Sequence, residues 1–300
     1  MLDRSELYDA DLVARLTRRE IGGPPSPYPH RGVHRSPRRG ASLEFSEHVE
    51  YSAGDDLRHL DWKVLAKSDR YFVKRYEDER LQRAVFLVDA SASMAYGANG
   101  SGTPRGSKYH LAARLAVALG ACLLHQGDAV GLALAGGGDH AYLPPRSSES
   151  QLEATMEVLG AAVPAGTANL SASCGGLAER LGRGASVFVL SDVLDPADEE
   201  LEALRFLAAR GLSPRLVQVL HADELDLPFE NTTKFVDLEG PGSLVIDPLA
   251  VRRAYAEELR DFVERVARAA ALLAVPRALV TTATDPAPAL AGLLRGLGRR

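Results

Sequence analysis

From residue 84 onward, short apolar runs alternate with helical stretches, and this alternation constrains the fold more than any other feature. The apolar runs are AVFLVD (84–89), AVGLALA (129–135), ASVFVLSD (185–192), PRLVQVLHA (214–222) and RALVTTA (277–283). Helical patterns lie at about 108–126, 149–162, 168–182, 196–210, 248–274 and 287–298. Continuous apolar strands separated by helices are typical of a parallel sheet that is covered on both faces. We therefore expect a doubly wound, mostly parallel α/β fold, whose ligand lies beyond the carboxyl ends of the strands.

Two further segments add antiparallel strands to this expectation. GGGDHAYLPP (136–145) predicts a tight turn into an antiparallel edge strand, and residues 233–247 predict a small hairpin before the last long helix. The chain has 300 residues, of which 46% are hydrophobic. A chain of this size can bury a full core without disulfide bonds or structural metals.

The chain divides into three sections. Residues 1–40 hold a short helix at 5–20, with leucines on one side, and then a basic Pro/Gly-rich linker as an N-terminal extension. Residues 41–83 mix extended and turn patterns with many charges, and we expect this segment to pack on the main domain. Residues 84–300 form the main α/β domain.

Several classes of protein are excluded. The two cysteines, Cys122 and Cys174, form no CxxC pair, so zinc ribbons and thioredoxin-type chemistry lack their ligands. The most apolar helical run, 111–124, is too short to span a bilayer. The N-terminus is rich in acids and matches neither a signal peptide nor a transit peptide. We expect a cytoplasmic protein without a membrane span, and the arginine-rich, lysine-poor composition favours a bacterial source.

Residues 22–40 form a basic segment that contains no acidic residue, and its role has two interpretations. Its arginines are Arg31, Arg35, Arg38 and Arg39. Such a segment can be a solvated linker or a basic arm that contacts nucleic acid. The net charge of −5 argues against a general nucleic-acid binder, and we expect no specific nucleic acid as a partner.

Oxygen-bearing side chains follow the ends of two predicted strands. The first predicted strand ends at Asp89, and Ser91 and Ser93 follow it. The third predicted strand ends at Asp192, and Thr167 lies in the sequence between these two strands. Each has a structural alternative, since serines satisfy turn backbone and Thr167 can cap the next helix. As a set without Cys or His, they suit a hard cation such as Mg²⁺, with Mn²⁺ or Ca²⁺ as alternatives.

This set resembles the metal-ion-dependent adhesion site (MIDAS) of von Willebrand factor A domains, a Rossmann-like family. That family's pattern is DxSxS, then a threonine, then an aspartate after a later strand, and all five positions match in order. The resemblance implies that Ser91, Ser93 and Thr167 approach the metal directly, while the two aspartates act mainly through water. It also implies that an acidic side chain of a protein partner completes the metal's ligand shell.

The preceding segment is similar to the signature of the domain-of-unknown-function family 58 (DUF58), and the resemblance extends from about residue 40 to 295. The matching residues are Glu44, Phe45, Tyr51, Gly54, Asp55, Asp56, Arg58, Asp61, Trp62 and Lys63. Many relatives carry two membrane helices and a β domain upstream, so this chain resembles the short form. The resemblance implies a MoxR-type AAA+ ATPase, or a client that it remodels, as the partner.

The first functional hypothesis is therefore a non-catalytic, Mg²⁺-dependent module that captures an acidic residue of a protein partner. The alternative is a Mg²⁺-dependent phosphohydrolase with Asp89 as nucleophile. Two points argue against it: position 91 is a serine where a second carboxylate is expected, and no lysine lies in an obvious charge-stabilising place. Within the signature, Asp56, His59 and Asp61 can form an acid/base group, or Arg58 and Asp61 can form structural ion pairs.

Overall fold

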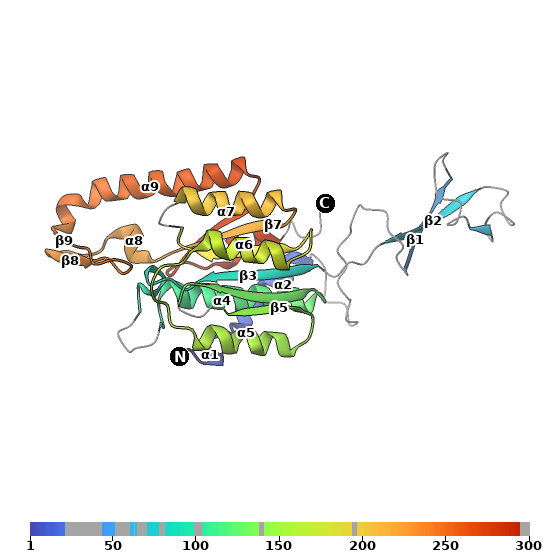
Figure 1. Cartoon of the computed structure of the whole chain (residues 1–300), viewed down its shortest axis with the longest axis horizontal. Helices are drawn as coiled ribbons and strands as arrows, with labels where there is room; N and C mark the ends of the chain where they lie inside the picture. The colour runs from blue at the N-terminus through green and yellow to red at the C-terminus, as the bar shows by residue number, and fades with distance from the viewer. Residues whose placement is uncertain are drawn as a thin grey trace.

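A six-stranded sheet lies at the centre of the main body, with helices on both faces (Figure 1). The computed structural model describes residues 1–21, 44–51, 61, 62, 64, 71–77, 82–98, 104–137, 141–193 and 197–294. The order across the sheet is β10-β7-β6-β3-β4-β5. The bounds are β3 (Arg83–Asp89), β4 (Ala129–Ala135), β5 (Tyr142–Arg146), β6 (Ser186–Ser191), β7 (Ser213–Leu220) and β10 (Arg277–Thr281).

The pairing of these strands confirms the expected fold class. All neighbours are parallel except β5, which runs antiparallel to β4 at the edge of the sheet. Every residue of β4 and β6 is buried, as expected for strands that are covered on both faces. The edge strand β5 contains Pro144 and Pro145, which lack the N–H that a central strand must donate.

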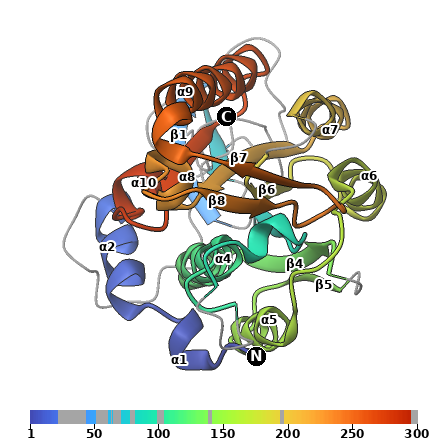
Figure 2. The ribbon, with the colours of Figure 1, turned by 90° about the vertical axis from the view of Figure 1, so that its left-hand side faces the viewer.

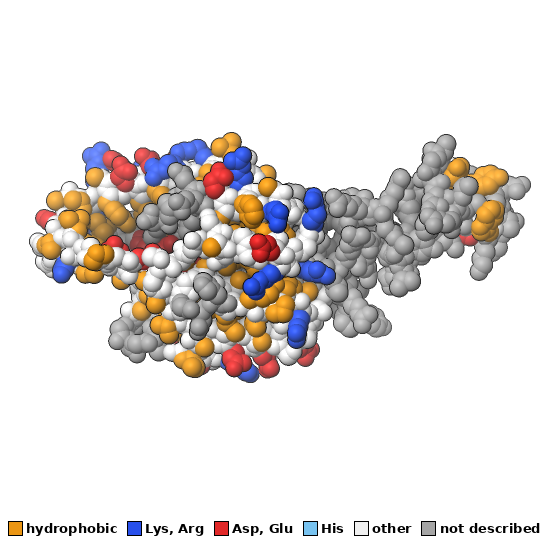
Figure 3. All heavy atoms as spheres, viewed as in Figure 1, with side chains coloured by type: hydrophobic (Ala, Val, Ile, Leu, Met, Phe, Trp, Pro, Cys, Tyr) orange, Lys and Arg blue, Asp and Glu red, His pale blue; other side chains and the backbone are white. Residues whose placement is uncertain are grey.

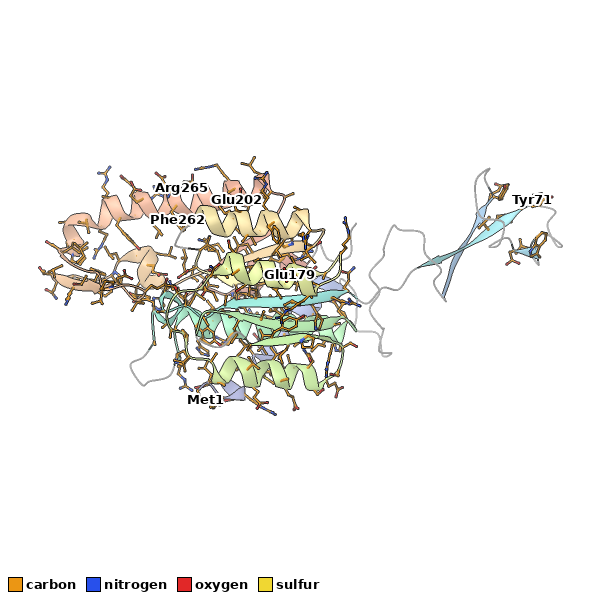
Figure 4. The ribbon with its side chains drawn as sticks, in the orientation of Figure 1. Met1, Tyr71, Glu179, Glu202, Phe262 and Arg265 are labelled. Atoms are coloured by element: carbon orange, nitrogen blue, oxygen red, sulfur yellow. The ribbon has the colours of Figure 1, made fainter. Side chains whose placement is uncertain are left out.

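The helices form two layers, one on each face of the sheet (Figure 2). Their bounds are α1 (Arg4–Leu7), α2 (Ala10–Ile21), α4 (Lys108–His125), α5 (Ser150–Ala161), α6 (Leu170–Arg180), α7 (Ala197–Ala209), α8 (Ala222–Asp226), α9 (Pro248–Leu272), α10 (Ala287–Leu294) and the short 3-10 helix η2 (Ser93–Ala95). One core contains α4, α5, α10 and the N-terminal helices. The other contains α6, α7 and α9, and Figure 4 labels Phe262 of α9, which packs against it.

The N-terminal helices belong to the core of the body. Leu7, Leu12 and Leu16 are buried, and α2 packs against α4 and α10. The expected single helix at 5–20 is wrong, because the chain forms two helices there. Asp9 accepts a hydrogen bond at Oδ1 from the Leu12 N–H at 2.9 Å, so it starts a new helix after α1 has ended.

A separate antiparallel ribbon is formed by β1 (Glu44–Glu50) and β2 (Phe72–Glu77). These two strands lie away from the body (Figure 1), and Figure 4 labels Tyr71, which directly precedes β2. The Asp61 N–H donates to the Phe72 carbonyl at 2.8 Å, whereas the Trp62 side chain is 67% exposed. The proposed division into 1–40, 41–83 and 84–300 stays a prediction.

A second hairpin lies at the carboxyl edge of the sheet. It consists of β8 (Thr233–Val236) and β9 (Ser243–Ile246), as expected for 233–247. Figure 2, which looks onto this edge, shows the hairpin crossing in front of the main sheet.

Cys122 and Cys174 are buried and form no disulfide. Within the described ranges, no helix is both long and apolar enough to cross a membrane.

Candidate metal centre

Asp89 is fixed in orientation at the end of β3. Its Oδ1 accepts a hydrogen bond from the Ser91 N–H, and its Oδ2 accepts one from the Ser191 hydroxyl, both at 2.8 Å. Ser191 is the last residue of β6, the neighbouring parallel strand, so the sheet itself brings these groups together. Asp89 is only 2% exposed. A buried carboxylate held by two donors is preorganised rather than free to rotate.

Ser91 and Ser93 place their hydroxyl oxygens side by side after β3. The two Oγ atoms lie 3.0 Å apart, with Ser91 buried and Ser93 half-buried at the start of η2. The turn is tied to the loop that carries Thr167, because the Ala92 N–H donates to the Gly166 carbonyl at 2.8 Å. Gly166 has a φ of +65°, which favours glycine at this position.

Thr167 is exposed in this loop and does not cap the following helix. The N-cap of α6 is Asn169, whose Oδ1 accepts a hydrogen bond from the Ala172 N–H at 2.7 Å. The alternative in which Thr167 caps the next helix is therefore wrong. The loop of Thr167 lies against the turn of Ser91 and Ser93, although the structure gives no contact between Thr167 and those hydroxyls.

Asp192 follows β6 and is 3% exposed. Its Oδ2 accepts a hydrogen bond from Lys108 Nζ at 2.7 Å, and the same ammonium donates to Glu224 Oε1 at 2.6 Å. The Lys108 side chain is 1% exposed at the start of α4. The expectation that no lysine occupies a charge-stabilising place at this site is therefore wrong.

The charges at this edge perturb one another. Burial, followed by the negative charge of Asp192, raises the pKa of Asp89 to about 6, although the hydrogen bonds from Ser91 and Ser191 act in the opposite direction. Burial by itself lowers the pKa of Lys108, but the charges of Asp192 and Glu224 outweigh it and raise that pKa. The two aspartates are therefore close enough to repel each other, and Lys108 remains a cation beside them.

These residues fit a hard divalent cation. The oxygens of Asp89 and Asp192 supply charge, and the paired hydroxyls of Ser91 and Ser93 supply neutral oxygen donors. Across the part of the chain that the structure describes, no cluster of three or more His, Cys, Asp or Glu side chains is arranged to hold a metal. A cation at this edge would be held by one or two carboxylates, with hydroxyls and water in its remaining positions, and Mg²⁺ in proteins typically combines one or two carboxylates with several waters.

Sequence reasoning missed four residues of this site. Ser191 directly precedes Asp192 in the sequence, so its position at a strand end could have indicated it. Lys108 opens α4, which also contains Arg114, so its charge alone did not distinguish it from a solvated surface residue. Glu224 and Glu239 lie in the segment between β7 and α9, and their places at the site follow only from tertiary structure. Glu239 Oε1 accepts a hydrogen bond from the Ser93 N–H at 3.2 Å.

The residues of the predicted family signature are only partly described. Asp61 and Trp62 lie in or beside the ribbon of β1 and β2. The others, together with the basic segment, fall outside the described residues: Gly54, Asp55, Asp56, Arg58 and 22–40.

Comparison with known proteins identifies the family. The family described as "Protein of unknown function DUF58" matches residues 47–265 of this sequence. The chain belongs to the DUF58 family. This DUF58 chain is 27% identical over 192 residues to uncharacterized proteins of Mycobacterium bovis (Mb1516) and Mycobacterium tuberculosis (Rv1480). Each match spans 63% of this chain and 58% of the relative.

Solved structures similar to this DUF58 chain include BatB, a conserved hypothetical protein from Bacteroides thetaiotaomicron. That match has 16% identity and a TM-score of 0.48, and it covers 73% of this chain and 100% of the other. An aerotolerance-related membrane protein from Bacteroides fragilis has 18% identity and a TM-score of 0.44, with 72% and 98% covered. The SpRpn10 VWA domain has 10% identity and a TM-score of 0.38, with 74% and 98% covered. At these identities the similarity concerns the fold alone.

Proposed function

We propose that this chain is a protein-binding module that holds a divalent cation, Mg²⁺ foremost, and captures an acidic residue of a protein partner. The observation that carries the proposal is the arrangement at the end of β3, where Asp89 is locked by two hydrogen bonds beside the paired hydroxyls of Ser91 and Ser93. Asp192 would add the second carboxylate and Thr167 the third hydroxyl. When bound, the cation would supply a positive charge at the edge of the sheet.

The chemistry of the donor set explains why a partner's carboxylate would bind. Mg²⁺ requires six oxygen ligands, and two carboxylates with a few hydroxyls leave positions that water fills. An incoming Asp or Glu would replace one water by a charged oxygen. Binding linkage is reciprocal, so the cation must raise the affinity for the partner by the factor by which the partner raises the affinity for the cation.

Calorimetric titration with Mg²⁺ tests the cation site. Wild type should bind Mg²⁺, and Asp89→Ala should lose this binding while it remains folded by circular dichroism. Asp261→Ala is the matched control, because Asp261 is exposed on α9. Equal Mg²⁺ affinity in wild type and Asp89→Ala would refute the site.

The partner we propose is a MoxR-type AAA+ ATPase or a client that it remodels. Support comes from the DUF58 family and from the acidic-ligand chemistry above. The purified ATPase should bind the immobilised chain in Mg²⁺, and this binding should be lost in EDTA and in Asp89→Ala. Binding that is unaffected by EDTA would overturn the metal-bridge mechanism, and loss in Asp261→Ala would point to a different surface.

One observation favours the second candidate, a Mg²⁺-dependent phosphohydrolase with Asp89 as nucleophile. Lys108 lies at the site and binds Asp192, so a positive charge that could stabilise a phosphoryl group is present. Against this, both oxygens of Asp89 accept hydrogen bonds and the carboxylate is buried. Hydrolysis of p-nitrophenyl phosphate that requires Mg²⁺ and is lost in Asp89→Asn would favour the enzyme; no turnover would favour the binding module.

A further inference from the structure

A carboxylate of the chain itself already lies at the proposed cation site. Glu239 is in the loop that joins β8 to β9, and its Oε1 accepts a hydrogen bond from the Ser93 N–H at 3.2 Å. Ser93 also carries one of the two hydroxyls that lie 3.0 Å apart. Glu239 is therefore beside the donor set, at a sequence separation of 146 residues.

The local structure of the loop holds Glu239 in place. Its N–H donates to Asp237 Oδ1, and the Asp237 N–H donates to the Gly242 carbonyl, both at 2.9 Å. A Cβ at Gly240 would lie 2.6 Å from Asp237 Oδ2, so a side chain there would displace the carboxylate that holds the Glu239 N–H. These contacts make a tight turn that projects one carboxylate toward Ser93.

The segment between β7 and α9 also contacts the site through a second glutamate. Glu224 of α8 binds Lys108, and the Tyr255 hydroxyl of α9 donates to the Glu224 carbonyl at 2.7 Å. Phe229 and Phe235 pack edge to face at 5.4 Å, which joins the segment after α8 to the hairpin. The segment between β7 and α9 thus contacts both Lys108 and Ser93 of the site.

We propose that Glu239 is an acidic ligand that the chain supplies to its own cation site, in the place that a partner's carboxylate would take. This inference rests on the proposed function. Glu239 and its neighbours in the loop are exposed, and Figure 3 shows apolar side chains gathered at the end of the molecule where β8 and β9 lie. An exposed single contact is easily exchanged. An external acidic residue would therefore compete with Glu239 and move the hairpin aside.

The test measures binding of Mn²⁺, as a spectroscopic substitute for Mg²⁺, by electron paramagnetic resonance. Glu239→Gln keeps the size of the side chain and removes its charge. Loss of the charge of this ligand should weaken Mn²⁺ binding by at least about tenfold, since loss of a partner outside the ligand shell already has an effect of that size. Glu230→Gln is the matched control, because Glu230 is exposed in the segment that leads into the same hairpin.

Hydrogen exchange supplies the second measurement. In wild type, Mg²⁺ should slow exchange of the amides at 237–242, and in Glu239→Gln it should not. If wild type binds Mn²⁺ and Glu239→Gln binds it equally, or if Mg²⁺ leaves the exchange of the wild-type loop unchanged, Glu239 is not a ligand although the cation site stands. If wild type binds no Mn²⁺, the proposed function fails and this inference fails with it.

Discussion

Replacement of Lys108 by methionine should lower the free energy of unfolding of the metal-free protein and should make the protein bind Mg²⁺ more tightly. The Lys108 side chain is 1% exposed, and its two partners, Asp192 and Glu224, are 5% and 17% exposed. Methionine retains most of the apolar stem and removes the ammonium. Two carboxylates then lose their cation, and Asp192 also remains near Asp89, whose negative charge repels it.

The magnitude follows from the burial of these groups. Removal of one partner from a buried ion pair costs about 3–5 kcal/mol, because the remaining charge is left uncompensated. Glu224 is partly exposed and can recover hydration, so we expect a loss of about 3 kcal/mol in the free energy of unfolding in EDTA. Asp192 no longer has to be shared with an ammonium, so Mg²⁺ should bind the variant more tightly. If the variant binds Mg²⁺ tenfold more tightly, saturating Mg²⁺ should reduce the difference in free energy of unfolding between wild type and the variant by about 1.4 kcal/mol.

Urea denaturation followed by circular dichroism, in EDTA and in Mg²⁺, measures both effects. Lys234→Met is the matched control, since Lys234 is exposed on β8 and should change the free energy of unfolding by less than about 0.5 kcal/mol. If Lys108→Met unfolds in EDTA at the same urea concentration as wild type, the buried ion pair is not stabilising. If Mg²⁺ instead increases the difference in free energy of unfolding between wild type and Lys108→Met, the Lys108 ammonium assists cation binding and does not compete with it.

Three further predictions concern two other residues of the site and the N-terminal helices. The raised pKa of Asp89 means that the folded protein holds a proton more tightly than the unfolded chain between about pH 4 and 6. In EDTA the free energy of unfolding should therefore fall as pH rises through this interval and level off above it, and Asp89→Asn should remove this fall in urea titrations; a rise in wild type would refute the argument. Thr167→Ala should weaken calorimetric Mg²⁺ binding without loss of helix, because Asn169 caps α6; unchanged affinity would remove Thr167 from the site. Leu16→Ala should cost about 2–5 kcal/mol in urea denaturation, because Leu16 is fully buried; a loss below about 1 kcal/mol would separate the N-terminal helices from the core.

The central sheet could be predicted because its strands are buried on both faces and hold few polar residues. AVGLALA is apolar throughout, and each of its residues is buried as β4. The N-terminal region was less predictable. Its leucines have helical spacing, but the break near Asp9 depends on one side-chain hydrogen bond, and the packing of α2 on α4 and α10 involves residues far apart in the sequence. Local patterns do not contain such contacts.

For the candidate site, the sequence predicted Asp89 and Asp192 at strand ends, but it missed Ser191 beside Asp192 and the charged residues that come from other parts of the chain. Asp89 and Asp192 are placed by the register of β3 and β6, which the apolar runs reveal. Lys108 reaches Asp192 across 84 residues of sequence, and Glu239 reaches Ser93 across 146. Both are single charged residues in segments of ordinary composition, so only the folded chain distinguishes them from solvated surface charges.

The balance of charge at this edge leaves room for the proposed cation beside the buried lysine. Lys108 divides its hydrogen bonds between Asp192 and Glu224, so each carboxylate receives only part of one positive charge. Asp89 has no direct contact with the ammonium among the interactions of the described residues, and burial, followed by the negative charge of Asp192, raises the pKa of Asp89 to about 6. The negative charge that Lys108 leaves uncompensated is therefore centred on Asp89, beside the hydroxyls of Ser91 and Ser93. The proposed divalent cation would be best stabilised at that point, which is also the point that Glu239 approaches from the hairpin.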